Sequence, residues 1–135
     1  MPGRGFLDVA RDVANGKTEF HYRAAVIHAY YALILECRDT LFRWKFVMPR
    51  RDNMHAWVRL RFTYATSADV KPIGDALDRL VQDRNEASYN LKSSAFATSV
   101  IAHNAIGYAS AALILLDQIE ADPARRTAAI ASIRP

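Results

Sequence analysis

Apolar residues recur at intervals of three, four and seven along most of the chain, a spacing that predicts helices. The longest such pattern predicts a helix that is capped by Thr18 and runs to about Trp44. It has a seven-residue repeat of Phe20, Ile27, Ile34 and Leu41, with Tyr30, Cys37 and Trp44 each three residues after the last three of these. Further small and aliphatic residues widen its apolar surface, so we expect a central helix contacted on more than one side.

Four further helices are predicted from the same spacing and from capping and interrupting residues. Asn15-Gly16 ends the first of them, because both residues tolerate positive φ. Asn53 caps another, and Ser93 or Ser94 caps the last. These helices cover about 6–14, about 54–66, a segment that starts near Lys71-Pro72, and about 95–121.

The pattern as a whole predicts an all-α fold, an antiparallel bundle of four to five helices. No internal repeat, low-complexity tract or run of alternating polarity is present, so strands are not expected. Asp122-Pro123 interrupts the last helical pattern. We therefore expect a single domain over residues 1–122 and a short C-terminal tail over 123–135, either helical or frayed.

The composition is that of an ordinary soluble globular domain. The chain has 135 residues, of which 51% are apolar and 24% charged. The longest apolar stretches, about 24–35 and 105–116, are too short or too amphipathic to span a bilayer. The first residues contain no apolar segment followed by a cleavage site. We therefore expect a cytoplasmic protein without a membrane segment.

Neither a metal site nor a cofactor is predicted. The four histidines are dispersed, with no pair at the helical spacing of three or four that would place two imidazoles on one metal. Walker and Rossmann glycine patterns are absent from the sequence. Cys37 is the only cysteine, which excludes an internal disulfide. Its apolar surroundings favour a buried structural thiol, while the neighbouring Arg38 keeps a reactive thiol as the alternative.

Positive charge is concentrated in one segment of a mildly basic chain. The formal net charge is +4, and seven Arg or Lys residues lie between positions 38 and 61, interleaved with aromatic residues. This composition suits contacts with nucleic-acid phosphates and bases, or else a solvated helix end and loop whose aromatic residues face the core. The candidate nucleic-acid-binding residues are Arg43, Lys45, Arg50 and Arg51.

The fourth helix carries a basic residue on or beside its apolar side. The apolar stripe consists of Val70, Ile73, Leu77, Leu80 and Val81. Continued at the same spacing, it reaches Arg84 and then Ala87, so the arginine stands where a leucine is expected. Arginine is seldom buried without a partner. A binding site or an interface at Arg84 is therefore the hypothesis to test.

Two polar neighbours extend this candidate site. Asn85 and Tyr89 share one face of the helix, and Arg84 flanks them, so the three side chains can share one small site. The structural alternative is that Arg84 pairs with Glu86 or Asp83 in solvent, or bonds the carbonyls at its own helix end.

Two segments resemble the HEPN superfamily of small helical domains associated with nucleotides and RNA. Residues 84–89, RNEASY, resemble the family motif, in the branch that reads Arg, two residues, Ala, Asp or Ser, and Tyr. Residues 28–33, HAYYAL, resemble the Ala-Tyr-Tyr-Ala stretch of the same branch. The likeness covers roughly residues 6 to 120 and implies a HEPN-like helical bundle.

The resemblance also implies a function, but this sequence differs from the catalytic members of the family at one residue. In catalytic members a His, without metal, assists attack of an RNA 2′-hydroxyl on the adjacent phosphate while the Arg steadies the developing charge. Here Tyr89 stands at the place of that His, and a tyrosine, with a reference pKa of about 10 against about 6.5 for histidine, is a poor base. We therefore expect an RNA- or nucleotide-binding module, weakly or not catalytic, with Arg84, Asn85 and Tyr89 in a cleft of a homodimer.

Two other functions stay open. One is an active metal-independent endoribonuclease, the toxin of a toxin–antitoxin pair with a nucleotidyltransferase-type antitoxin, or a phage-defence factor. His55 begins a helix beside the basic connection and is the residue that would then supply the missing base. The other is a structural or assembly protein in which Arg84 completes a hydrogen-bond network between helices.

Overall fold

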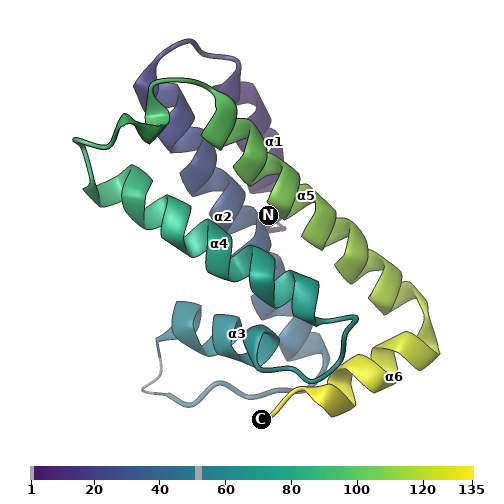
Figure 1. Cartoon of the computed structure of the whole chain (residues 1–135). Coiled ribbons are helices and arrows are strands. Elements are labelled where there is room, and N and C mark those ends of the chain that lie inside the picture. Colours follow the sequence, from purple (N-terminus) through teal and green to yellow (C-terminus); the bar gives the residue numbers. More distant parts are fainter. Residues whose placement is uncertain (1, 51–52) are drawn as a thin grey trace.

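The chain folds into a helical bundle, which confirms the predicted all-α class (Figure 1). The computed structural model describes residues 2–50 and 53–135, and no strand occurs in that part of the chain. The described residues form six α-helices and one short 3₁₀ helix. These are α1 (Gly5–Ala14), α2 (Glu19–Arg43), α3 (Met54–Thr63), α4 (Lys71–Tyr89), η1 (Ser94–Phe96), α5 (Val100–Ala121) and α6 (Pro123–Ser132).

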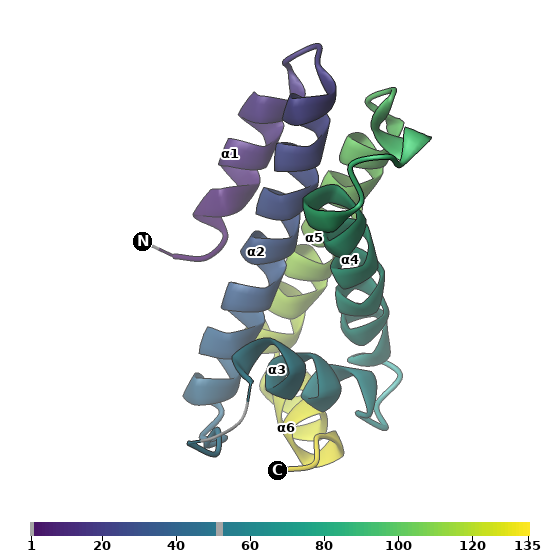
Figure 2. The same ribbon diagram turned by 90° about the vertical axis from the view of Figure 1, so that its left-hand side faces the viewer.

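Helix α2 is the central element, as its widened apolar surface predicts. The hydroxyl of Thr18 caps it by accepting from the backbone N–H of His21. Helix α1 lies on one side of α2, and α4 and α5 lie on the other (Figure 2). Val26, Leu33 and Ile34 are completely buried between these neighbours. The core therefore surrounds α2, in which Tyr30 is buried and Tyr31 is partly buried.

The C-terminal part of the chain departs most from the sequence prediction. Phe96 is fully buried in the turn η1, and α5 starts only at Val100 rather than near residue 95. Residues after Asp122 form a sixth helix, which Asp122 caps by accepting from two backbone N–H groups. Ala129 of α6 is completely buried against the bundle. The described residues therefore form six α-helices, against the four to five predicted.

A glycine allows α3 and α4 to cross at close range. A Cβ atom at Gly74 would lie 2.7 Å from the carbonyl oxygen of Phe62 and 2.8 Å from the Cα of Thr63. Asp78, one turn further along α4, accepts from Thr63 Oγ1 at 3.2 Å and from Arg59 Nη1 at 3.3 Å. This crossing orients the first turn of α3 toward the second half of α4, where Arg84 lies.

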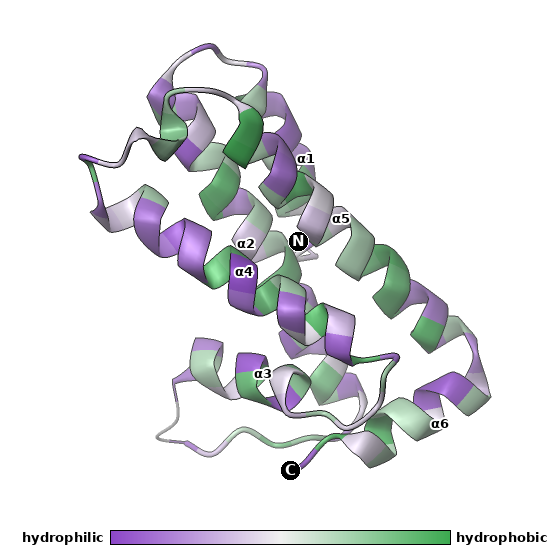
Figure 3. Ribbon diagram, in the orientation of Figure 1, coloured by the Kyte–Doolittle hydropathy of each residue, from purple (hydrophilic) through white to green (hydrophobic). Residues whose placement is uncertain are grey.

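Helix α5 is the most apolar helix of the bundle (Figure 3). By length and composition it is the one helix of the described residues that could cross a membrane, with a mean hydropathy of 1.4 over its most apolar window. Ala102, Ala105 and Ala109 are completely buried in the bundle. Only 33% of that window is buried, however, so much of the helix faces outward.

Candidate functional site

Arg84 projects from α4 onto two tyrosine rings of α2. Its guanidinium carbon lies 5.3 Å from the ring centroid of Tyr30 and 6.0 Å from that of Tyr31. Both distances fit a cation–π contact, in which the negative face of the ring attracts the cation. The fold therefore brings together the two segments that carry the family resemblance, although they are more than fifty residues apart in the sequence.

The two carboxylates that could have paired with Arg84 bond to other residues instead. Asp83 accepts from Arg79 Nε at 3.3 Å, and Glu86 accepts from the side-chain amide of Asn90 at 3.0 Å. Arg84 itself donates to the Asn85 side-chain oxygen at 3.0 Å. Among the described residues, no carboxylate forms an ion pair with Arg84. Its side chain is only partly buried, so an anion from solution can reach it.

His55 completes the cluster from the first turn of α3. Its Nδ1 lies 2.5 Å from the hydroxyl oxygen of Tyr30, and the two rings are stacked with centroids 5.6 Å apart. The edge of Tyr31 meets the same imidazole at 6.0 Å. Arg84, Tyr30, Tyr31 and His55 thus form one group of side chains from α4, α2 and α3, which we call the Arg84 cluster.

The protonation states of this cluster follow from its surroundings. Burial raises the pKa of Tyr30 to about 12, so the phenol keeps its proton at neutral pH. Burial and the nearby Arg84 cation both lower the pKa of His55 below its ordinary value, because each disfavours the imidazolium. At neutral pH the cluster therefore contains the fixed positive charge of Arg84, a neutral His55 imidazole and the neutral phenol of Tyr30.

The backbone of α3 adds to the positive character of the cluster. Asn53 caps this helix, its side-chain oxygen accepting from the N–H of Ala56 at 3.2 Å. His55 is therefore in the first turn, where the helix macrodipole is equivalent to roughly half a positive charge. A phosphate is stabilised by such a terminus and by a guanidinium. The electrostatics of the cluster therefore favour an anion.

The other two predicted site residues, Asn85 and Tyr89, are both exposed. Asn85 contacts Arg84, as described above, and is exposed. Tyr89, the last residue of α4, is 76% exposed and, together with Tyr31 and Tyr30, raises the pKa of Arg84. The aromatic rings in contact with the guanidinium are those of Tyr30 and Tyr31 instead. Sequence spacing along one helix did not reveal these contacts, because they come from α2.

A second arginine, Arg23, is the one that is buried. It is 5% exposed and stacks on Phe96, with its guanidinium carbon 4.4 Å from the ring centroid. It donates to the carbonyl oxygens of Glu86 at 3.1 Å, Ala87 at 3.0 Å and Asn90 at 3.0 Å, so it caps the end of α4. Its spacing of seven residues before Tyr30 is the sequence signal that could have identified it.

Two of the candidate nucleic-acid-binding residues, Arg43 and Lys45, lie away from the Arg84 cluster. Arg43 donates to Thr40 Oγ1 at 2.9 Å and lies twelve residues beyond Tyr31, which is about 18 Å along a helix. Lys45, with a φ of 70°, and Arg126 of α6 line a shallow pocket of about 280 Å³ together with Arg43. Arg50 is exposed, whereas Arg51 lies outside the described residues.

The tryptophans of that segment face the core rather than solvent, whereas Phe42 is 44% exposed. Trp44 is 7% exposed and Trp57 is 3% exposed, while Phe46 is partly buried. Neither tryptophan is available to stack on bases. The segment retains its charges, and the fold adds Arg126, which is distant in the sequence and could not be grouped with Arg43 and Lys45 in advance.

The remaining candidates from the sequence are a reactive Cys37 thiol and a metal site. Cys37 is completely buried, and burial raises the pKa of its thiol well above the ordinary value. This supports the structural reading of the cysteine. Within residues 2–50 and 53–135, no three His, Cys, Asp or Glu side chains gather closely enough to hold a metal ion.

Comparisons of the chain with protein families, with curated proteins and with solved structures found no match.

Proposed function

We propose that this chain is a HEPN-like module that binds a phosphate group of RNA or of a nucleotide at the Arg84 cluster. The observation that carries the proposal is the partly exposed Arg84 guanidinium, which rests on two tyrosine rings and has no carboxylate partner among the described residues. A guanidinium held in this way presents its N–H groups in a planar fork that matches two phosphate oxygens.

The neighbours of Arg84 support the same ligand. The first turn of α3 contributes backbone N–H groups and a positive macrodipole next to His55. Neutral His55 and Tyr31 add hydrogen-bonding groups that can contact a phosphate oxygen or a ribose hydroxyl. The resemblance of residues 84–89 and 28–33 to HEPN domains agrees with this assignment, because those two segments supply Arg84, Tyr30 and Tyr31.

Binding of labelled RNA tests the proposal. We expect fluorescence anisotropy to show binding that weakens with salt, since phosphate contacts release counterions. Arg84→Ala removes charge-assisted hydrogen bonds worth about 1.5–3 kcal/mol, so we expect the dissociation constant to rise roughly 10- to 100-fold. Arg11→Ala, a matched loss of one charge on α1, should leave the affinity within about twofold at the same salt. Equal affinities for the Arg84→Ala variant and the unaltered chain would refute the proposal.

Metal-independent cleavage of RNA is the second candidate, and the position of His55 favours it. In the tautomer in which Nδ1–H donates to the Tyr30 oxygen, Nε2 has a free lone pair and can take the proton of a 2′-hydroxyl. The 2′-oxygen would then bond to phosphorus, the bond to the 5′-oxygen would break, and that oxygen would receive a proton. Arg84 would stabilise the charge on the phosphoryl oxygens.

Incubation with labelled RNA in the presence of a chelator separates the two candidates. Cleavage that is lost in both His55→Ala and Arg84→Ala, and retained in Tyr89→Phe, supports the ribonuclease. Binding without turnover supports the module alone. A neighbouring gene for a nucleotidyltransferase-type antitoxin would add support for a toxin. If the chain neither binds nor cleaves RNA or a nucleotide, the cluster has the structural role described for Arg84 above.

A further inference from the structure

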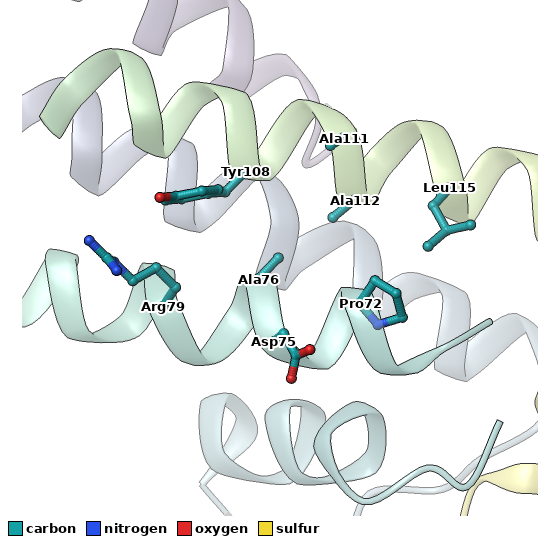
Figure 4. Close-up of a pocket in the computed structure, with 8 residues that line it drawn as sticks. All are labelled: Pro72, Asp75, Ala76, Arg79, Tyr108, Ala111, Ala112 and Leu115. Carbon is teal, nitrogen blue, oxygen red and sulfur yellow. The ribbon is translucent and has the colours of Figure 1, made fainter. Parts of the chain in front are cut away.

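Two hollows of the surface differ in their chemistry. The larger is a groove of about 490 Å³ between α4 and α5 with mainly apolar walls, and Arg79 in its lining already donates to Asp83 (Figure 4). The smaller has a volume of about 280 Å³ and lies at the C-terminal end of α2. We call it the α2–α6 pocket, and it is lined by Arg43, Trp44, Lys45, Glu120, Arg126 and Ile130.

Three cations and one carboxylate line the α2–α6 pocket. Lys45 and Arg126 are exposed, and neither forms an ion pair within the described residues. The carboxylate of Glu120 lies 3.5 Å from Arg43 Nη2, which is longer than the roughly 2.7–2.9 Å of a strong charge-assisted bond. The three cations less this carboxylate leave a net charge of +2 around the hollow. A charge of this sign attracts an anion.

The carbonyl groups at the end of α2 oppose an anion less than those of an open helix end, because they are bonded within the chain. The N–H of Lys45 donates to the carbonyl oxygen of Phe42 at 3.1 Å, and that of Phe46 donates to the carbonyl oxygen of Leu41 at 3.0 Å. These two bonds form a Schellman motif, in which glycine is the usual residue at the position of positive φ. Lys45 occupies that position with a φ of 70°, a conformation that costs a lysine more than a glycine. Backbone strain of this kind is concentrated at functional sites.

The uncharged part of the lining combines apolar surface with a polar atom that has no partner. Trp44 is 7% exposed, and Ile130 of α6 is partly buried. The indole Nε1 of Trp44 is buried and has no hydrogen-bond acceptor among the described residues. A buried N–H without an acceptor costs free energy, which an oxygen atom that reached it would recover. The pocket therefore suits a ligand that has both an anionic and an apolar part.

We propose that the α2–α6 pocket binds the terminal phosphate of a small phosphomonoester. Such a group has a charge of about −1.5 to −2 at pH 7, because its second pKa is near 6, and this charge matches the net charge of the pocket. A phosphodiester of an RNA backbone has a charge of about −1, so it would leave the pocket with an excess of positive charge. Arg43, Lys45 and Arg126 donate to the phosphate oxygens. Ile130 and the part of Trp44 that lines the pocket contact the organic part.

The fluorescence of Trp44 tests this proposal on the full chain. Trp57→Phe leaves Trp44 as the only tryptophan, because the sequence has two. We expect glycerol phosphate to change this fluorescence until the pocket is saturated. Arg126→Ala removes a charge-assisted donor, so the dissociation constant should rise about tenfold or more. Arg11→Ala, the loss of one charge on α1, should leave the dissociation constant within about twofold of the original.

Lys45→Gly separates an effect on binding from an effect on folding. Glycine removes the ammonium group and also relieves the strained φ. The affinity for glycerol phosphate should therefore fall about tenfold, while the melting temperature rises by a few degrees. Partial unfolding cannot produce these opposite changes. An unchanged affinity in Lys45→Gly would contradict the role given to this residue and to the pocket.

Short RNA oligomers distinguish a terminal phosphate from the phosphates of a backbone. In a chain with Trp57→Phe and Arg84→Ala, we expect an oligomer with a 5′-phosphate to change the fluorescence of Trp44 at a lower concentration than the same oligomer with a 5′-hydroxyl. Equal responses would assign the pocket to backbone phosphates and overturn the proposal, as would the absence of a saturable change with glycerol phosphate. Loss of RNA binding in Arg84→Ala would not, because that change tests the Arg84 cluster alone.

Discussion

The buried Arg23 should be one of the most sensitive positions of the fold. Its guanidinium makes three bonds to carbonyl oxygens at the end of α4 and two to a Glu19 carboxylate oxygen, at 2.7 and 2.9 Å. Arg23→Met keeps the aliphatic stem but removes every donor. Removing a charged donor from buried acceptors costs about 3 kcal/mol, allowing for the partly exposed Glu19, out of a total stability of roughly 5–15 kcal/mol.

Chemical denaturation and thermal melting followed by circular dichroism measure this cost. For a chain of this size we expect the melting temperature of Arg23→Met to fall by about 10 °C. Glu19→Gln is the control, because it removes only an ion pair within α2 whose carboxylate is 48% exposed, worth about 0.5 kcal/mol. Hydrogen exchange should also accelerate for the backbone amides of residues 87–91. A loss of less than about 1 kcal/mol in Arg23→Met would show that water satisfies these carbonyls equally well.

Three further predictions concern packing, pH and reactivity. Gly74→Ala should destabilise the fold by about 1–3 kcal/mol, because its Cβ would meet the backbone of α3. Gly107→Ala should instead stabilise the fold by about 1 kcal/mol, because its Cβ would meet nothing within 4 Å and alanine favours the helix. Burial lowers the pKa of His28 and of His55 below the ordinary histidine value of about 6.5. At a pH near or below that value the unfolded chain therefore binds more protons than the folded chain. The free energy of unfolding should consequently fall as the pH drops from 7 toward 5. Replacing both histidines with glutamine should flatten this pH dependence, and an unchanged slope would contradict the assignment. The Cys37 thiol should resist a chromogenic thiol reagent in the folded chain and react in denaturant, so rapid labelling without denaturant would contradict its burial.

Local sequence signals were reliable wherever a helix is determined by its own residues. Thr18 and Asn53 cap the helices for which they were predicted, and the widened apolar surface correctly indicated that α2 is central. The seven-residue repeat was a poorer guide, because its first residue, Phe20, is 82% exposed. The start of α5 was predicted wrongly, because the tertiary burial of Phe96 favours the separate turn η1 over a continuous helix. The helix α6 was left open in the prediction, since its stability depends on packing Ala129 against the bundle.

The sequence by itself determined the all-helical class, the central helix and the unusual position of Arg84 on an apolar stripe, because these follow from the periodicity of single helices. Only the tertiary structure decided what Arg84 contacts. Its partners come from two other helices: Tyr30 and Tyr31 approach it through the packing of α2 against α4, and His55 through the crossing of α3 and α4 at Gly74. Contacts between helices depend on how their surfaces pack, and the spacing of residues along one helix contains no record of that packing.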